Sequence, residues 1–123
     1  MSKPQIVFID DTPEDVELAE FALATAGVTV ATTRVCTDRA LLALLSTRLP
    51  DAIVCDLMIP GFDGMAALRI VSRHAPGIPF ILHSGCIAEK HSQAALALGA
   101  FGCVEKHQTD TFVTLVKKAL RAA

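Results

Sequence analysis

Three short apolar runs in this chain do not alternate with polar residues, and this feature restricts the fold more than any other. The runs are Ile6-Val7-Phe8-Ile9, Ala52-Ile53-Val54-Cys55 and Phe80-Ile81-Leu82. A strand with one face in water alternates apolar and polar residues, whereas a strand that is buried on both faces does not. The runs therefore predict central strands of a parallel sheet that helices cover on both faces.

Helical segments separate the predicted strands. The first helix is expected to begin with a Thr12 cap and Pro13, to place Leu18, Ala22 and Ala26 on its apolar face, and to stop at Gly27. The other predicted helices lie over Asp38–Leu49, Gly64–His74 and Glu89–Leu98 and around Phe112–Ala119. The predicted strands are Gln5–Ile9, Thr29–Val35, Ala52–Cys55, Phe80–His83 and Cys103–Glu105.

Strand and helix alternate five times, which predicts an α/β fold with a doubly wound, five-stranded parallel sheet, five helices and right-handed crossovers. The length of 123 residues is that of one domain, so we expect a single domain over residues 1–123 with no output domain.

The composition narrows the function further. Hydrophobic residues make up 52% and charged residues 20% of the chain, which excludes a disordered protein. No Lys/Arg cluster exceeds a pair, the net charge is -2, and Trp and Tyr are absent, so nucleic acid is not the expected ligand. No apolar run approaches the ~18 residues of a membrane span. We expect a cytoplasmic protein without membrane contact, in which Cys36, Cys55, Cys86 and Cys103 are reduced.

Polar side chains follow four of the predicted strands where each strand ends. Asp10 and Asp11 follow the first strand, Asp56 the third, Ser84 the fourth and Lys106 the fifth. Each alone is usually a helix cap or a solvated side chain, but the carboxyl ends of parallel strands share one edge, where ligands bind. Clustered carboxylates repel one another unless a cation lies between them, and hard oxygen ligands favour Mg²⁺ or Mn²⁺. A neighbouring lysine is suited to an anion such as phosphate.

These residues resemble the response-regulator receiver domains of two-component signalling, the CheY-like family. The segment from Asp56 to Gly64 matches the pattern D-L-x-M-P-x-x-D-G, with only Ile59 in place of Met. The other matching pieces are Val7-Phe8-Ile9-Asp10-Asp11, Ser84-Gly85 and Lys106. The resemblance covers the whole chain and implies a flavodoxin-like fold with strand order 2-1-3-4-5.

The resemblance implies a role for each matched residue. Asp56 would accept a phosphoryl group from a phosphohistidine, and Lys106 would offset charge on the phosphoryl oxygens. Ser84 would hydrogen-bond the new phosphoryl group and report it to the surface. The implied Mg²⁺ or Mn²⁺ ligands are three carboxylates and one backbone carbonyl: Asp10, partly through water, Asp11, Asp56 and Met58.

Two positions depart from the family pattern. Cys103 stands where receivers usually carry an aromatic residue that swings inward with the Ser/Thr movement. His107 replaces a proline whose bond to the preceding lysine is cis, and without that proline we predict a trans Lys106–His107 bond and a reshaped loop. The resemblance also implies that Met58 and Cys86 flank the path of water to the phosphoryl group. Neither side chain orients water well, so we expect slow hydrolysis.

The predicted function is a stand-alone phosphorylation switch rather than an enzyme in the ordinary sense. Its expected partners are a sensor histidine kinase or a histidine phosphotransfer protein and a downstream protein target, and a homodimer is compatible with this function. The alternative is a receiver-like docking or dimerisation module that acts without phosphate. A flavin carrier on the same layout is excluded because Asp10 and Asp11 would repel the flavin phosphate.

Overall fold

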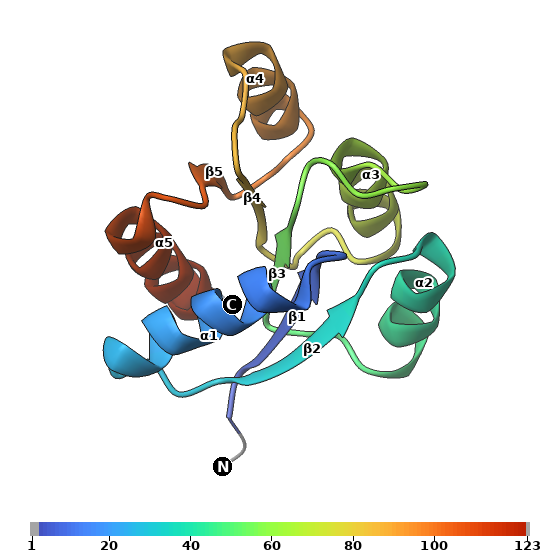
Figure 1. Cartoon of the computed structure of the whole chain (residues 1–123). Coiled ribbons are helices and arrows are strands. Elements are labelled where there is room, and N and C mark those ends of the chain that lie inside the picture. The colour runs from blue at the N-terminus through green and yellow to red at the C-terminus, as the bar shows by residue number, and fades with distance from the viewer. Residues whose placement is uncertain (1–2, 123) are drawn as a thin grey trace.

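Five strands alternate with five helices along the chain, as predicted (Figure 1). The computed structural model describes residues 3–122. The elements are β1 (Gln5–Ile9), α1 (Pro13–Thr25), β2 (Ala31–Val35), α2 (Asp38–Thr47), β3 (Ala52–Cys55), α3 (Gly64–His74), β4 (Phe80–Ser84), α4 (Glu89–Ala97), β5 (Gly102–Glu105) and α5 (Thr109–Ala122). Within residues 3–122 no helix has the length and apolar character needed to cross a membrane.

The strands form one parallel sheet in the order β2-β1-β3-β4-β5. The registers align the last residue of β1, Ile9, with Val35 of β2 and with Cys55 of β3. All strands therefore end at the same edge of the sheet. This order confirms the flavodoxin-like topology that the resemblance implied.

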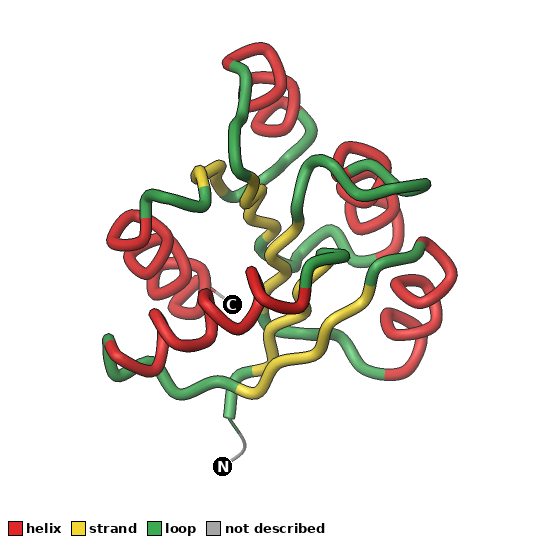
Figure 2. The backbone as a smooth tube through the Cα atoms, in the orientation of Figure 1, coloured by secondary structure: helices red, strands yellow, loops and turns green. Residues whose placement is uncertain are grey.

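The two faces of the sheet carry separate apolar cores. Ile6 and Phe8 of β1 pack with residues of α1 and α5, whereas Val7 and Ile9 pack with residues of α2 and α3. Figure 2 shows the strands running between these helix layers. All four residues of β3 are buried, which explains why its apolar run does not alternate with polar residues.

Several element ends differ from the prediction. Helix α2 ends at Thr47 instead of Leu49, and Leu49 is 54% exposed. The reason is Pro50, which disfavours helical backbone at the residue before it. Helix α4 stops at Ala97, one residue before the predicted end. Strand β2 starts two residues later than predicted, while the other changes lengthen β4 and β5 by one residue each, so that Ser84 is the last residue of β4.

The predicted buried face of α1 was wrong. Val16, Ala19 and Leu23 are buried, whereas Leu18 is 67% exposed. Alanines and larger apolar residues lie on more than one side of this helix, so its sequence presents two apolar faces. Packing against β1 and α5 decides which of the two is buried. The Thr12 side chain makes no capping hydrogen bond either, and the Thr12 backbone N–H donates to Asp10 Oδ1 at 2.9 Å.

Candidate functional site

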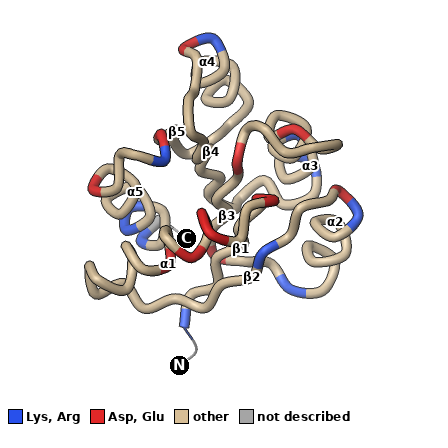
Figure 3. Tube along the Cα trace, in the orientation of Figure 1, with Lys and Arg blue, Asp and Glu red and all other residues tan. Residues whose placement is uncertain are grey.

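The ends of β1 and β3 bring two carboxylates side by side. The backbone N–H of Asp10 donates to Val35 O at 3.0 Å, and that of Asp56 donates to Ile9 O at 2.8 Å, so both residues continue the ladder of the sheet. Figure 3 shows acidic segments at the ends of β1 and β3 and at the start of α1, with positive charge following β5. Both residues are buried: 4% of the surface of Asp10 and 8% of the surface of Asp56 is exposed.

Three carboxylates at this edge could hold a metal ion. One oxygen from each of Asp10, Asp11 and Asp56 lies within 4.8 Å of the others, and Asp11 is the exposed member. Carboxylate oxygens at such spacing, with one side open to water, are the donor set that Mg²⁺ and Mn²⁺ prefer. The predicted metal carboxylates are thus brought together, and they fit the ion that the resemblance implies.

The ammonium group of Lys106 lies among carboxylates at the same edge. Its Nζ is 2.9 Å from Asp10 Oδ2, 3.0 Å from Asp56 Oδ2 and 2.7 Å from Asp15 Oδ2. Burial alone would lower the pKa of Lys106, but these three carboxylates outweigh burial and raise it. Lys106 is therefore a fixed positive charge at any physiological pH.

Asp56 receives more hydrogen bonds than any other carboxylate of the site. Ser84 Oγ donates to its Oδ1 at 2.6 Å, the Met58 N–H donates to the same oxygen at 3.2 Å, and Lys106 donates to Oδ2. Burial raises the pKa of Asp56, but these donors outweigh it and the pKa is lowered. Burial dominates at Asp10, whose pKa is raised despite the Lys106 bond. Of the two buried carboxyl groups, Asp56 therefore has the lower pKa and ionises more readily.

Gly64 lets α3 begin directly against the backbone of Asp56. Its N–H donates to Leu57 O at 2.8 Å, and a Cβ at Gly64 would lie 2.5 Å from the backbone oxygen of Asp56. Asp63 caps the same helix by accepting the Ala66 N–H at 2.8 Å. The final D-G pair of the sequence motif therefore supports the loop that carries Asp56.

We expect Gly64→Ala to lower the free energy of unfolding by about 2 kcal/mol, because the added methyl group must displace backbone. Gly77→Ala is the matched control, since a Cβ there would meet no atom within 4 Å. Urea denaturation followed by circular dichroism measures both variants. Equal stabilities for the two variants would contradict the close approach.

Two further residues lie next to the site, and the contact made by the first was not predicted from the sequence. Asp15 lies in the first turn of α1, where an acid is favourable in itself, yet it is also a partner of Lys106. His83 lies buried on the α1/α5 face of the sheet, with its ring stacked on Phe112 at a centroid distance of 4.5 Å. Alternation along β4 predicts that His83 faces away from Ser84, and the stacking of His83 on Phe112 agrees with this.

The two departures from the family pattern have local consequences. Cys103 is half-buried, and its Sγ lies 3.9 Å from Ser92 O of α4. The Lys106–His107 bond is trans, as predicted, since the part of the chain that is described has no cis peptide bond. Glu105 ties β5 to the loop after β4, because its Oε2 accepts the Ile87 N–H at 2.8 Å.

The comparison with protein families identifies the chain. The model of the response regulator receiver domain matches residues 6–117. The chain therefore belongs to the response regulator receiver family of two-component signalling, in agreement with the resemblance of its motifs.

Full-length regulators and isolated receivers both resemble this chain. The DNA-binding transcriptional regulator NtrC of Salmonella typhimurium is 30% identical over 98% of this chain and 25% of its own length. The nitrogen assimilation regulatory protein NtrX of Azorhizobium caulinodans is 31% identical over 94% of this chain and 26% of its own. The chain thus spans about a quarter of the length of these curated relatives.

Solved structures agree with the fold. The signal receiver domain of NarL from Mycobacterium tuberculosis has a TM-score of 0.82 and 26% identity, covering 100% of both chains. A CheY-like receiver domain protein from Methanospirillum hungatei has a TM-score of 0.83 and 20% identity over 98% of this chain and 95% of its own, a likeness of fold alone.

Proposed function

We propose that this receiver accepts a phosphoryl group on Asp56 from a histidine kinase or a histidine phosphotransfer protein, and that the adduct controls a partner protein or passes the phosphate on. The observation that carries the proposal is the Asp56 carboxylate, which is anionic, next to the open edge of the sheet and flanked by Lys106 and Ser84. An Asp56 oxygen forms a bond to phosphorus while the bond between phosphorus and the donor imidazole nitrogen breaks. The imidazole keeps that electron pair and takes up a proton.

We assign the metal to Asp10, Asp11 and Asp56, whose oxygens lie within 4.8 Å of one another. A bound Mg²⁺ or Mn²⁺ would supply positive charge for the oxygens of the phosphoryl group. The Met58 carbonyl as a further ligand stays a prediction from the resemblance. The Met58 N–H instead has a role that the structure supports, since it orients Asp56 Oδ1.

Lys106 and Ser84 would bind the phosphoryl group once it is attached to Asp56. The Lys106 ammonium already contacts Asp56 Oδ2, so it can pass to a phosphoryl oxygen attached there. Ser84 can transfer its hydrogen bond in the same way, and the loop that follows Ser84 is tied to β5 through Glu105 and Ile87. With Cys103 in place of the aromatic residue, this Glu105 link is a route by which the surface near α4 could respond.

A cytoplasmic location agrees with the four cysteines, which are free thiols in the structure. The organisation of residues 1–123 as a stand-alone receiver, without nucleic-acid or membrane contact, stays a prediction, as does a homodimer. The docking alternative has one observation in its favour, the exposed Leu18 and Phe21 on α1, beside a pocket between α1 and α5. Phosphorylation and docking through this face are compatible.

Incubation of the protein with acetyl phosphate and Mg²⁺, followed by intact-mass spectrometry, tests the proposal. We expect one phosphoryl group per chain, and none when EDTA removes the metal. Mass is the suitable readout because the chain has no Trp or Tyr for fluorescence. An unmodified mass with both acetyl phosphate and a cognate phosphodonor would favour the docking alternative.

The lifetime of the adduct should depend on Met58. The Met58 side chain is 75% exposed at the open edge of the site, and a thioether is a poor hydrogen-bond partner for an attacking water. We expect Met58→Asn to shorten the half-life of the adduct roughly threefold, a barrier change of under about 1 kcal/mol. Decay of the phosphorylated mass after removal of the donor measures the half-life, and Leu42→Asn, on the exposed side of α2, is the control. An unchanged half-life would count against a role for Met58.

A further inference from the structure

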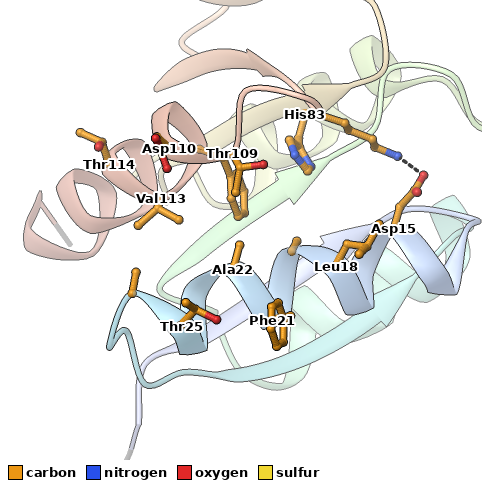
Figure 4. A pocket seen from close by; sticks show the side chains of 14 residues that line it. Asp15, Leu18, Phe21, Ala22, Thr25, His83, Thr109, Asp110, Val113 and Thr114 are labelled. Atoms are coloured by element: carbon orange, nitrogen blue, oxygen red, sulfur yellow. Dashed lines mark hydrogen bonds and ion pairs between the residues drawn. The ribbon is translucent and has the colours of Figure 1, made fainter.

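Asp15 makes the shortest of the three contacts to Lys106, and it is the only one of the three carboxylates outside the metal cluster. Its Oδ2 is 2.7 Å from Nζ, whereas Asp10 and Asp56 lie at 2.9 and 3.0 Å. The dashed line in Figure 4 marks this contact at one end of the α1–α5 pocket. Asp10 and Asp56 belong to the carboxylates that could hold a metal, and Asp15 does not.

The three N–H bonds of the ammonium group are matched by three acceptors. Two of these acceptors would be engaged in the phosphorylated protein, because Asp56 Oδ2 becomes an oxygen of the acyl phosphate and Asp10 is assigned to the metal. Asp15 is the one of the three that is neither the acceptor nor in the metal cluster, so its oxygen stays available to Lys106 throughout. Without it, the four-carbon stem of Lys106 would be free to turn toward water, since its side chain is 19% exposed.

The backbone fixes Asp15 firmly enough for this task. Pro13 opens α1 and sets the first turn, and the Asp15 N–H donates to Thr12 O at 3.1 Å. The negative charge is also favourable near a helix N-terminus. A side chain on a helix places its partner more accurately than one on a loop.

We propose that Asp15 is a positioning residue that holds the Lys106 ammonium over the acceptor carboxylate while Asp10 and Asp56 are engaged elsewhere. This inference rests on the proposed function of Asp56, but the placement of Lys106 can be tested without phosphate. Asp15→Ala removes the contact. Asp15→Asn keeps an acceptor oxygen and removes only the charge, so it should rescue most of the effect if position is what matters.

The first experiment measures how freely Lys106 reacts. The protein, saturated with Mg²⁺ and without phosphodonor, is treated with trace acetic anhydride, and peptide mass spectrometry gives the acetylation of Lys106 relative to the exposed Lys90 and Lys118. Loss of one charge-assisted hydrogen bond should raise Lys106 labelling about fivefold in Asp15→Ala. Glu14→Ala, a neighbouring acid that is exposed, is the matched control and should leave labelling unchanged. Unchanged labelling in Asp15→Ala overturns the proposal.

The second experiment measures phosphorylation by acetyl phosphate at saturating Mg²⁺. We expect Asp15→Ala to slow adduct formation roughly threefold to tenfold, with Asp15→Asn near wild type, consistent with a misplaced charge in the transition state. Calorimetric Mg²⁺ affinity should stay within about twofold of wild type, since Asp15 is outside the metal cluster and its partly exposed charge is screened by salt. If Asp15→Ala is phosphorylated at the same rate as the wild type, the inference is overturned. A wild type that is not phosphorylated refutes the proposed function instead, and the labelling experiment still decides on Asp15.

Discussion

Asp56→Asn is expected to abolish the phosphoryl adduct completely. The substitution conserves shape, and the carboxamide oxygen can still accept hydrogen bonds from Ser84 Oγ and the Met58 N–H, as Oδ1 does now. What is lost is the anionic oxygen beside Lys106. An amide oxygen is a far weaker nucleophile than a carboxylate oxygen, because it carries no full negative charge. Loss of the adduct would therefore report chemistry rather than a collapsed site.

Asp63→Asn is the matched control for this experiment. Asp63 belongs to the same sequence motif, but its carboxylate caps α3 by accepting the Ala66 N–H, a bond that an asparagine can also accept. We expect this variant to take up one phosphoryl group as the wild type does. Intact mass after incubation with acetyl phosphate and Mg²⁺ compares the three proteins. An adduct that persists in Asp56→Asn would mean that another side chain is the acceptor.

The second large effect is a loss of stability in mild acid that comes from His83. Burial, together with the nearby charge of Lys106, lowers the pKa of His83 from 6.5 to about 4. Below pH 6.5 the unfolded chain binds a proton at this residue, whereas the folded chain does not until about pH 4. The stability that His83 contributes is therefore complete above pH 6.5 and is lost as the pH falls toward 4. Linkage predicts a loss of about 2 kcal/mol between pH 7.5 and pH 5.

His83→Gln removes the titrating group and keeps a polar side chain at the same place. We expect the loss between pH 7.5 and pH 5 to be smaller by about 2 kcal/mol in this variant than in the wild type. His107→Gln is the control, because the His107 side chain is 70% exposed. Urea denaturation followed by far-ultraviolet circular dichroism at the two pH values gives each free energy of unfolding. The same pH dependence in His83→Gln and wild type would show that His83 is not buried in its neutral form.

The local pattern of residues predicted the order of elements and most of the site. The apolar runs that form β1, β3 and β4 are buried on both faces of the sheet. Strands of this kind do not alternate apolar and polar residues, so they can be recognised in the sequence. Parallel strands end at one edge, and for that reason Asp10, Asp56 and Ser84 could be grouped from their positions alone. Helix starts that depend on one residue, such as Pro13 in α1, were also correct.

Packing between distant segments decided the rest. Helix α1 carries apolar residues on more than one side, so only its contact with β1 and α5 could choose Val16 and Leu23 over Leu18. The pairing of Asp15 with Lys106 joins residues 91 positions apart in the chain, and no local pattern encodes such a contact. The low pKa of His83 has the same origin, because it is set by burial against Phe112 and by the charge of Lys106. The sequence thus determined which groups reach the edge of the sheet, since the residue that follows each strand is set locally. Only the tertiary structure decided which of those groups touch, because contact depends on side chains from segments that meet only after folding.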